Sequence, residues 1–238
     1  MVKVNLAEKF EDARKKINSI EKDVRKKINS IEYDAHWFRR VFHTFGASFL
    51  FYYMLPDVDW INLLKFWIPV FIIIFIFVLE YLRIKGKINS NHFFGLRMYE
   101  KNRIGSYVFF GVAIFILLLF FPQQIAVPCI LCASIADPVM GEVRHRFDEK
   151  KVIVTGFFIC MFFFIVTWYK ADLVITLLVS VVGAFGAVIG ETNTISWLDD
   201  DFLIQMVPAV MVLILFLIAG YFGYVLPDPI IHPGISPW

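Results

Sequence analysis

The chain has 238 residues, of which 59% are hydrophobic and 18% aromatic, and this is more apolar than a soluble domain of its size. The net charge is only +2, which provides no bulk positive field for nucleic acid and excludes a nucleic-acid partner on charge grounds. The apolar residues form long uninterrupted runs, so the sequence predicts an all-α, polytopic integral membrane protein in a plasma or endoplasmic-type membrane.

The first segment, 1–38, is charged and contains an internal repeat. Arg14-Lys-Lys-Ile-Asn-Ser-Ile-Glu21 recurs eleven residues later as Arg25-Lys-Lys-Ile-Asn-Ser-Ile-Glu32. An eleven-residue offset is three helical turns, and the apolar residues of the segment recur at three and four, so we expect an amphipathic helix. Such a helix would lie on the membrane surface, pair with a second copy to form a homo-oligomer, or extend into solvent before the first span.

Seven apolar runs follow in segment 39–224 and predict about seven transmembrane helices, because backbone groups in lipid must bond internally. The runs are 41–56, 62–82, 104–121, 123–140, 152–169, 171–190 and 202–224. A tail, 225–238, contains four of the ten prolines and is expected to be irregular.

The distribution of Lys and Arg predicts the orientation of these spans. Of the 23 basic residues, 21 lie in 1–40, 83–103 and 141–151, which fall on one side of the membrane if each run crosses it. Only Lys65 and Lys170 fall on the other side. The N-terminus is therefore expected to be cytoplasmic and the tail extracytoplasmic.

The ionisable residues beside the spans are all expected at this cytoplasmic side, where they form candidate functional groups. Carboxylates there would hold a metal or accept a proton, and cations would neutralise phosphate, which is what magnesium–nucleotide chemistry requires. The candidates are Arg39, Arg40, His43, Glu80, Arg83, Glu100, Asp137, Glu142, Arg144, Lys150, Lys151, Glu191, Asp199, Asp200 and Asp201.

Simpler interpretations exist for several of these residues. Glu80 and Arg83 are three apart on a helix and would form an ion pair, and the run of Asp199 to Asp201 would cap the last span. Asp137 is harder to explain structurally, because Pro138 follows it and predicts a helix break near membrane depth.

Four segments carry a family resemblance when they are taken in chain order. They are Arg39-Arg-Val-Phe-His43-x-x-Gly46, Glu80-x-x-Arg83 with Arg97-x-x-Glu100 and Gly105, Ala133-Ser-Ile-Ala-Asp137-Pro, and Glu191 with Leu198-Asp-Asp-Asp-Phe-Leu-Ile204. Together they resemble the motifs of the polyprenol kinases, which include dolichol kinase, phytol kinase and the CTP-dependent diacylglycerol kinase. The resemblance covers roughly residues 38–224.

The chain departs from the family pattern in the nucleotide motif. It has Met140, Arg144 and Asp148 where the family has Ala, Gly and Gly. It keeps Lys150 and Lys151 but lacks the Glu that follows them in the family. Glycines in such a loop let backbone N–H groups approach phosphate, so Arg144 is a candidate replacement as a phosphate ligand.

The resemblance implies a membrane lipid kinase that transfers a phosphoryl group from CTP, with Mg²⁺, to a long-chain alcohol such as dolichol or another polyprenol. The resemblance implies a catalytic set of Asp137, Glu191, Asp199 and Asp200, of which Asp137, Glu191 and Asp199 would also bind the metal. It implies that the nucleotide is bound by Glu142, Arg144, Lys150 and Lys151. It implies that the lipid headgroup is bound by Arg39, Arg40, His43, Glu80, Arg83 and Glu100. Two alternatives remain open. One is a cytidylyltransferase that acts on a lipid phosphate, and the other is an inactive family member that binds lipid or scaffolds partners.

Overall fold

In a computed structural model of the chain, the described residues are 14, 21, 37–88, 96, 100, 103–193, 195 and 197–233. Within these residues the secondary structure is helical, apart from turns and one isolated bridge between Ile195 and Leu198. This confirms the all-α membrane bundle. Arg14 and Glu21 are helical. The rest of the predicted amphipathic helix and its self-association lie outside the described residues.

The described chain consists of a helical segment at 37–46 followed by a series of helices in sequence order. These are η1 (Ala47–Leu50), α2 (Phe51–Met54), α3 (Asp59–Ile84), α4 (Ser106–Phe120), α5 (Gln123–Leu131), the π-helical turn η4 (Cys132–Ala136), α6 (Asp137–Arg144), α7 (Glu149–Trp168), α8 (Leu173–Thr192) and α9 (Asp200–Tyr221). Each of the seven predicted apolar runs falls on one of these helical segments.

Among the described residues, five helical stretches have the length and apolar composition to cross a membrane. They are α3, the continuous stretch Gln123–Arg144, α7, α8 and α9. Large apolar side chains cover their outer faces, including Phe71 and Phe75 on α3, which are 63% and 61% exposed. A soluble protein does not expose so large an apolar surface to water. The outer faces of these helices therefore contact lipid hydrocarbon, and the chain is an integral membrane protein.

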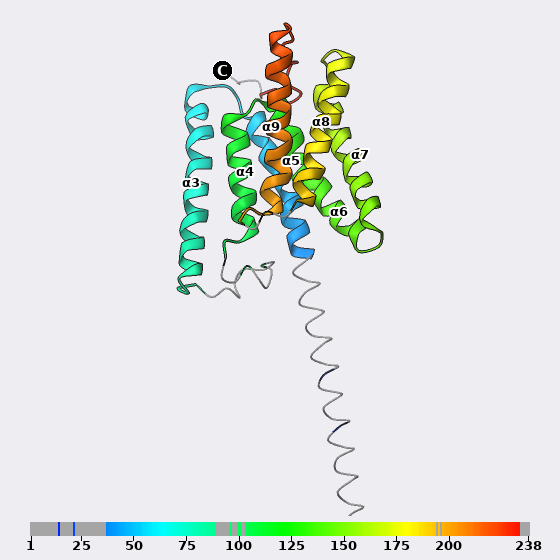
Figure 1. Cartoon of the computed structure of the whole chain (residues 1–238). Helices are drawn as coiled ribbons and strands as arrows, with labels where there is room; N and C mark the ends of the chain where they lie inside the picture. Colours follow the sequence, from blue (N-terminus) through cyan, green and yellow to red (C-terminus); the bar gives the residue numbers. More distant parts are fainter. Residues whose placement is uncertain are drawn as a thin grey trace, which may run out of the picture.

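The helices alternate in direction, with α9 near the centre of the bundle (Figure 1). α9 packs against α8, α4, α5 and η4, whereas α3 stands at the edge beside α4. The start of segment 37–46, the end of α3, the start of α4, α6, the end of α8 and the start of α9 all lie at one end of the bundle, the lower end in Figure 1. Basic residues Arg83, Lys85 and Lys87 at the end of α3, and those of 141–151 around the turn between α6 and α7, adjoin this end.

Two glycines, Gly46 and Gly190, lie where helices that carry polar residues pack closely against a neighbouring helix. A Cβ added at Gly190 of α8 would lie 2.4 Å from the backbone oxygen of Leu203 in α9, so these helices pack backbone to backbone. A Cβ at Gly46 would lie 2.5 Å from the ring of Phe110 in α4. Glycine at these positions therefore lets α8 and segment 37–46 approach α9 and α4 closely.

The predicted helix break before Pro138 is wrong, because the chain continues from α5 through η4 into α6. Pro138 has no N–H, and its ring would collide with the carbonyl of Ser134 in a regular α-helix. The wider π-helical turn, Cys132–Ala136, absorbs this mismatch immediately before Asp137. Asp137 thus sits in a continuous helix, next to a local widening of the kind often found at functional sites.

The described part of the tail, 225–233, contains no helix, as predicted. It folds back on the start of α5, where Gln123 exchanges two hydrogen bonds with the backbone of Ile231 and Gln124 donates to the carbonyl of Pro227. These hydrogen bonds hold the described part of the tail against the start of α5, at the end of the bundle opposite the charged residues.

Candidate functional site

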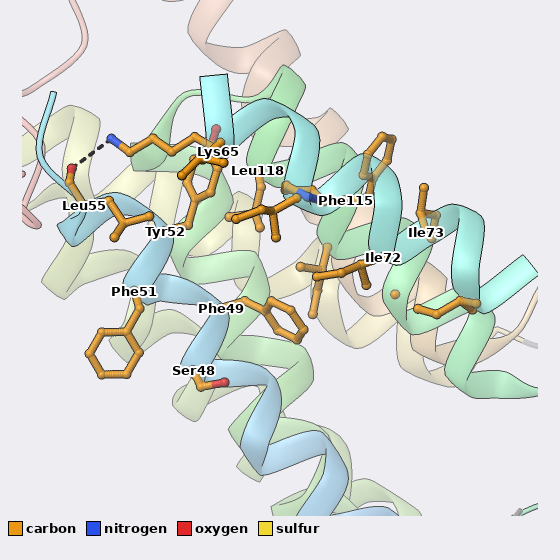
Figure 2. Close-up of a pocket in the computed structure, with 16 residues that line it drawn as sticks. Ser48, Phe49, Phe51, Tyr52, Leu55, Lys65, Ile72, Ile73, Phe115 and Leu118 are labelled. Carbon is orange, nitrogen blue, oxygen red and sulfur yellow. Dashed lines mark hydrogen bonds between the residues drawn. The ribbon is translucent and has the colours of Figure 1, made fainter. Parts of the chain in front are cut away.

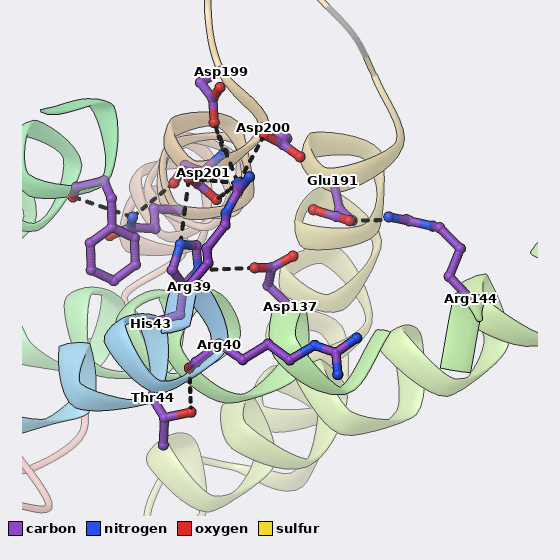
Figure 3. A network of polar contacts seen from close by, with 12 residues as sticks. Arg39, Arg40, His43, Thr44, Asp137, Arg144, Glu191, Asp199, Asp200 and Asp201 are labelled. Carbon is purple, nitrogen blue, oxygen red and sulfur yellow. Dashed lines mark hydrogen bonds and ion pairs between the residues drawn. The ribbon is translucent and has the colours of Figure 1, made fainter. Parts of the chain in front are cut away.

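Asp201, in the first turn of α9, lies at the centre of a polar cluster and is only 1% exposed. One guanidinium nitrogen of Arg39, Nη2, donates to both of its carboxylate oxygens, at 3.0 and 2.9 Å (Figure 3). The same nitrogen lies 3.7 Å from Asp200 and 4.0 Å from Asp199. A single cation from segment 37–46 therefore faces three carboxylates at the start of α9.

His43 follows Arg39 by one helical turn and is buried between two carboxylates. Its Nδ1 lies 3.0 Å from Oδ2 of Asp137, and its Nε2 lies 3.5 Å from Oδ2 of Asp201. The imidazole also stacks on the ring of Phe110, with 4.8 Å between the ring centroids. His43 thereby links three segments that are far apart in sequence, namely 37–46, α6 and α9 (Figure 3).

The remaining carboxylates, Asp199 and Asp200, lie at the N-terminus of α9. Oδ1 of Asp199 accepts a hydrogen bond from the backbone N–H of Asp201 at 3.2 Å and caps the helix, as one of the sequence interpretations predicted. Burial, with Asp200 and Asp201 close by, raises the pKa of Asp199 to about 9. Burial lowers the pKa of Arg39, but Asp201 and Asp200 outweigh this effect and hold that pKa above its usual range. Arg39 is therefore charged at every physiological pH.

Glu191 and Arg144 form a second pair beside this cluster. Nη2 of Arg144 donates to Oε1 of Glu191 at 3.0 Å, and the carboxylate is buried while the Arg144 side chain is 50% exposed. Glu191 lies in the last turn of α8 and Arg144 ends α6, so the pair joins two helix ends at the rim of the site.

A pocket of about 180 Å³ opens among these groups. Its lining combines cations with carboxylates, and Pro138 and Gly141 form its apolar part. The polar residues in the lining are Arg39, Arg40, His43, Asp137, Arg144, His145, Glu191 and Asp200. Positive groups beside carboxylates in a partly enclosed space are the elements that a phosphate-bearing, metal-bound ligand needs.

Arg40 and Glu142 form a further ion pair across the rim of this pocket, between segment 37–46 and α6. Glu142 also accepts a hydrogen bond from Arg146, one turn away, at 2.7 Å. Arg40 lines the pocket, whereas Glu142 does not belong to its lining.

Glu80, Arg83 and Glu100, predicted to bind a lipid headgroup, form a separate buried network. Arg83 donates to both carboxylate oxygens of Glu80, at 2.6 and 2.7 Å, and to the backbone carbonyls of Glu100 and Arg103. Glu80 also accepts from the N–H of Gly105 at 2.7 Å. The network ties the end of α3 to the start of α4, which is the simple pairing considered from the sequence, and none of the three lines the polar pocket.

Lys150 and Lys151, predicted to bind nucleotide, are exposed in the first turn of α7 and do not line the pocket. The ammonium of Lys151 lies over the ring of Phe147, 4.9 Å from its centroid. Among the described residues, the arginines that line the pocket are Arg39, Arg40 and Arg144 instead.

The carboxylates group differently from the predicted metal set of Asp137, Glu191 and Asp199. Among the described residues, Asp137 groups with His43 and Asp201, and Asp199 groups with Asp200 and Asp201. Glu191 comes from α8 and pairs with Arg144, so it joins neither group. The group at the start of α9 offers only carboxylate oxygens, and all three carboxylates lie within 4.0 Å of the Arg39 guanidinium.

The central residue, Asp201, was not singled out from the sequence beyond its place in the Asp199 to Asp201 run. One signal would have found it. Asp201, Gln205, Ala209 and Val212 are spaced four, four and three apart and share one helix face, and all four are buried. The spacing places Asp201 on the same face as the only polar residue of the run 202–212, Gln205, and the structure shows that this face is buried.

Comparisons of the chain with protein-family models, with curated proteins and with solved structures found no match. The polyprenol-kinase resemblance therefore depends on the motifs alone.

Proposed function

We propose that the protein is a membrane lipid kinase that transfers a phosphoryl group from a CTP-type nucleotide to a long-chain alcohol such as dolichol or another polyprenol. The observation that supports this best is the convergence of Arg39, His43, Asp137 and Asp201 at one end of the bundle. They come from three segments up to 162 residues apart and meet beside a pocket that contains further cations. A packed helical core does not need such a set of charges, and phosphoryl transfer does.

Each part of the pocket has a role in this proposal. Arg144 and Arg40 neutralise the nucleotide phosphates, and Asp137 accepts the proton of the lipid hydroxyl. The hydroxyl oxygen forms a bond to the γ-phosphorus as the bond to the β,γ-bridging oxygen breaks, so the nucleoside diphosphate leaves. Asp199 and Asp200 would hold Mg²⁺, which supplies charge neutralisation on the phosphate oxygens when it is bound.

The charged end of the bundle is proposed to face the cytoplasm, which is where nucleotides are available. The support is the distribution of basic residues, with 21 of 23 Lys and Arg at that side. The pocket then opens at the inner headgroup layer, where a lipid hydroxyl can meet a soluble nucleotide.

The direct test is an assay of the full-length protein with CTP or ATP as donor and with polyprenol or diacylglycerol as acceptor. We expect phosphorylated alcohol and CDP, with a loss of about 10² to 10⁴-fold in Asp137→Asn, since general-base catalysis contributes that much. Asp148→Asn is the matched control and retains activity, because Asp148 is exposed and outside the pocket. Release of pyrophosphate would assign a cytidylyltransferase instead. Transfer no higher than in Asp137→Asn, with both donors, would remove both enzymatic proposals.

The positions of the cations predict which residues hold the nucleotide. Arg144→Ala is expected to weaken binding of Mg²⁺–CTP by about tenfold to a hundredfold, because it removes a charged hydrogen-bond donor. Lys150→Ala and Lys151→Ala should each change binding by less than about twofold, as solvent-exposed charges do. Arg144→Lys should fall between, since it keeps the charge and loses the planar fork. Isothermal titration calorimetry measures all four, and a larger loss in the lysine variants would contradict this assignment.

One observation favours a second candidate, a non-catalytic lipid-binding or scaffolding member. Met140, which replaces a family Ala, is buried against α7, and a Cβ at Gly156 would lie 2.0 Å from its sulfur. The motif position therefore serves packing in this chain. The absence of both binding heat and thermal stabilisation with Mg²⁺ and CTP, in protein that still binds lipid alcohol, would select this candidate.

A further inference from the structure

A second groove runs beside the polar pocket, between segment 37–46 and the η4–α6 stretch. It encloses about 520 Å³. Its walls are mostly apolar, formed by Trp37 on one side and by Ile135, Val139 and Val143 on the other. Of these, Trp37 is 59% exposed and Val139 is 36% exposed, so the groove is open to the side of the bundle rather than closed within it.

The groove is continuous with the polar pocket. Arg40 and Pro138 line both of them. Pro138 directly follows Asp137, and Arg40 pairs with Glu142 at the groove's charged end. A molecule lying in the groove with its polar end at Arg40 therefore has that end beside Asp137.

The direction of the groove matches that of a membrane lipid. Trp37, Arg40 and Thr44 recur at three and four and lie on one helix face. From Trp37 at the charged end, the groove extends toward Thr44 and the bundle interior for roughly 10 Å, at 1.5 Å per residue. Trp37 lies at the end where interfacial Trp is expected, and neighbouring Phe45 is 65% exposed to the surroundings of the bundle. Hydrocarbon is the medium on that side.

We infer that this groove holds the alkyl chain of the acceptor lipid, with its hydroxyl at Arg40 and Asp137. The identity of the acceptor rests on the proposed function. The chain-binding surface itself rests on the apolar walls of the groove, its lateral opening and its shared residues with the polar pocket. Val139, Ile135 and Thr44 are then positioned to determine which chains are accepted.

A second apolar cavity, of about 250 Å³, lies between η1, α2, α3 and α4 (Figure 2). Its lining is almost wholly apolar, with Lys65 near one end and Ser48 near the other (Figure 2). It shares no lining residue with the polar pocket among the described residues, so a chain bound there does not place its hydroxyl at Asp137. This cavity provides the matched control.

The test uses full-length protein in vesicles that contain a long-chain alcohol bearing a diazirine in its chain, without nucleotide. After photolysis, mass spectrometry identifies the labelled peptides. We expect label in 37–44 and 135–143, reduced about tenfold by Val139→Trp and by Thr44→Trp, which fill the groove. Ile72→Trp, which fills the other cavity from a comparably exposed position, should change labelling by less than about twofold. Thermal unfolding confirms that each variant is folded.

Two outcomes would overturn the inference, namely labelling that Val139→Trp and Thr44→Trp leave unchanged, and labelling that Ile72→Trp abolishes. The two proposals can fail separately, because labelling requires no nucleotide. Groove labelling without phosphoryl transfer would retain the lipid site and reject the kinase. If transfer occurs, Val139→Trp should raise the KM for the alcohol about tenfold and leave the KM for the nucleotide unchanged.

Discussion

Arg39→Met is expected to destabilise the folded protein by about 3–5 kcal/mol, because it leaves a buried carboxylate without its main cation. Asp201 is 1% exposed and receives two hydrogen bonds from Arg39, and Asp199 and Asp200 lie within 4.0 Å of the same guanidinium nitrogen. Without Arg39, the basic side chain that remains beside the Asp201 carboxylate among the described residues is His43, at 3.5 Å. Unfolding of the purified protein, followed by tryptophan fluorescence in increasing SDS, measures the change.

The control for Arg39→Met is Arg146→Met, which removes an arginine whose side chain is 70% exposed and pairs with half-exposed Glu142. Such a pair is worth less than about 1 kcal/mol. The double variant Arg39→Met, Asp201→Asn should recover part of the lost stability, since the unpaired charge is then removed as well. Equal effects of Arg39→Met and Arg146→Met, or a double variant less stable than Arg39→Met alone, would show that the cluster does not depend on this pair.

Arg83→Met should have an effect of similar size, about 3–5 kcal/mol, although Arg83 does not line the pocket. Arg83 is buried, neutralises the buried Glu80, and satisfies two backbone carbonyls that join the end of α3 to the loop before α4. Its loss leaves the Glu80 charge and both carbonyls without that donor. The same SDS unfolding series measures it, with Tyr107→Phe as the milder control at about 1 kcal/mol, since it removes one hydroxyl donor to Glu80.

The Arg83 variant also separates two roles for this network. If it is a structural tie, as its geometry indicates, Arg83→Met lowers stability and leaves the KM for the lipid alcohol unchanged in protein that remains folded. A raised KM in folded protein, with little loss of stability, would instead support the headgroup role that the motif resemblance implied.

The sequence alone determined where the apolar helices lie, although only five of the predicted seven spans have the length and composition to cross a membrane among the described residues. Each apolar run became a helical segment, since lipid offers the backbone no hydrogen-bond partners and a long apolar run has no other way to satisfy its N–H and C=O groups. It also determined that the charged residues gather at one end. Arg39, Asp137 and Asp199 flank runs that cross in alternating directions, so their common side follows from counting the runs.

Only the tertiary structure decided which of these charged residues meet. Run length and composition place a residue at an end of the bundle, but they do not fix how each helix is rotated about its axis or how closely two helices approach. Close packing at Gly190 brings α8 against α9 and leaves Glu191 to pair with Arg144, while the rotation of α9 turns Asp201 inward to Arg39 and His43. Lys150 and Lys151 are exposed in the first turn of α7 and lie outside the pocket, which their place in the sequence did not show. Such contacts depend on packing between segments far apart in the chain, and local spacing carries no information about it.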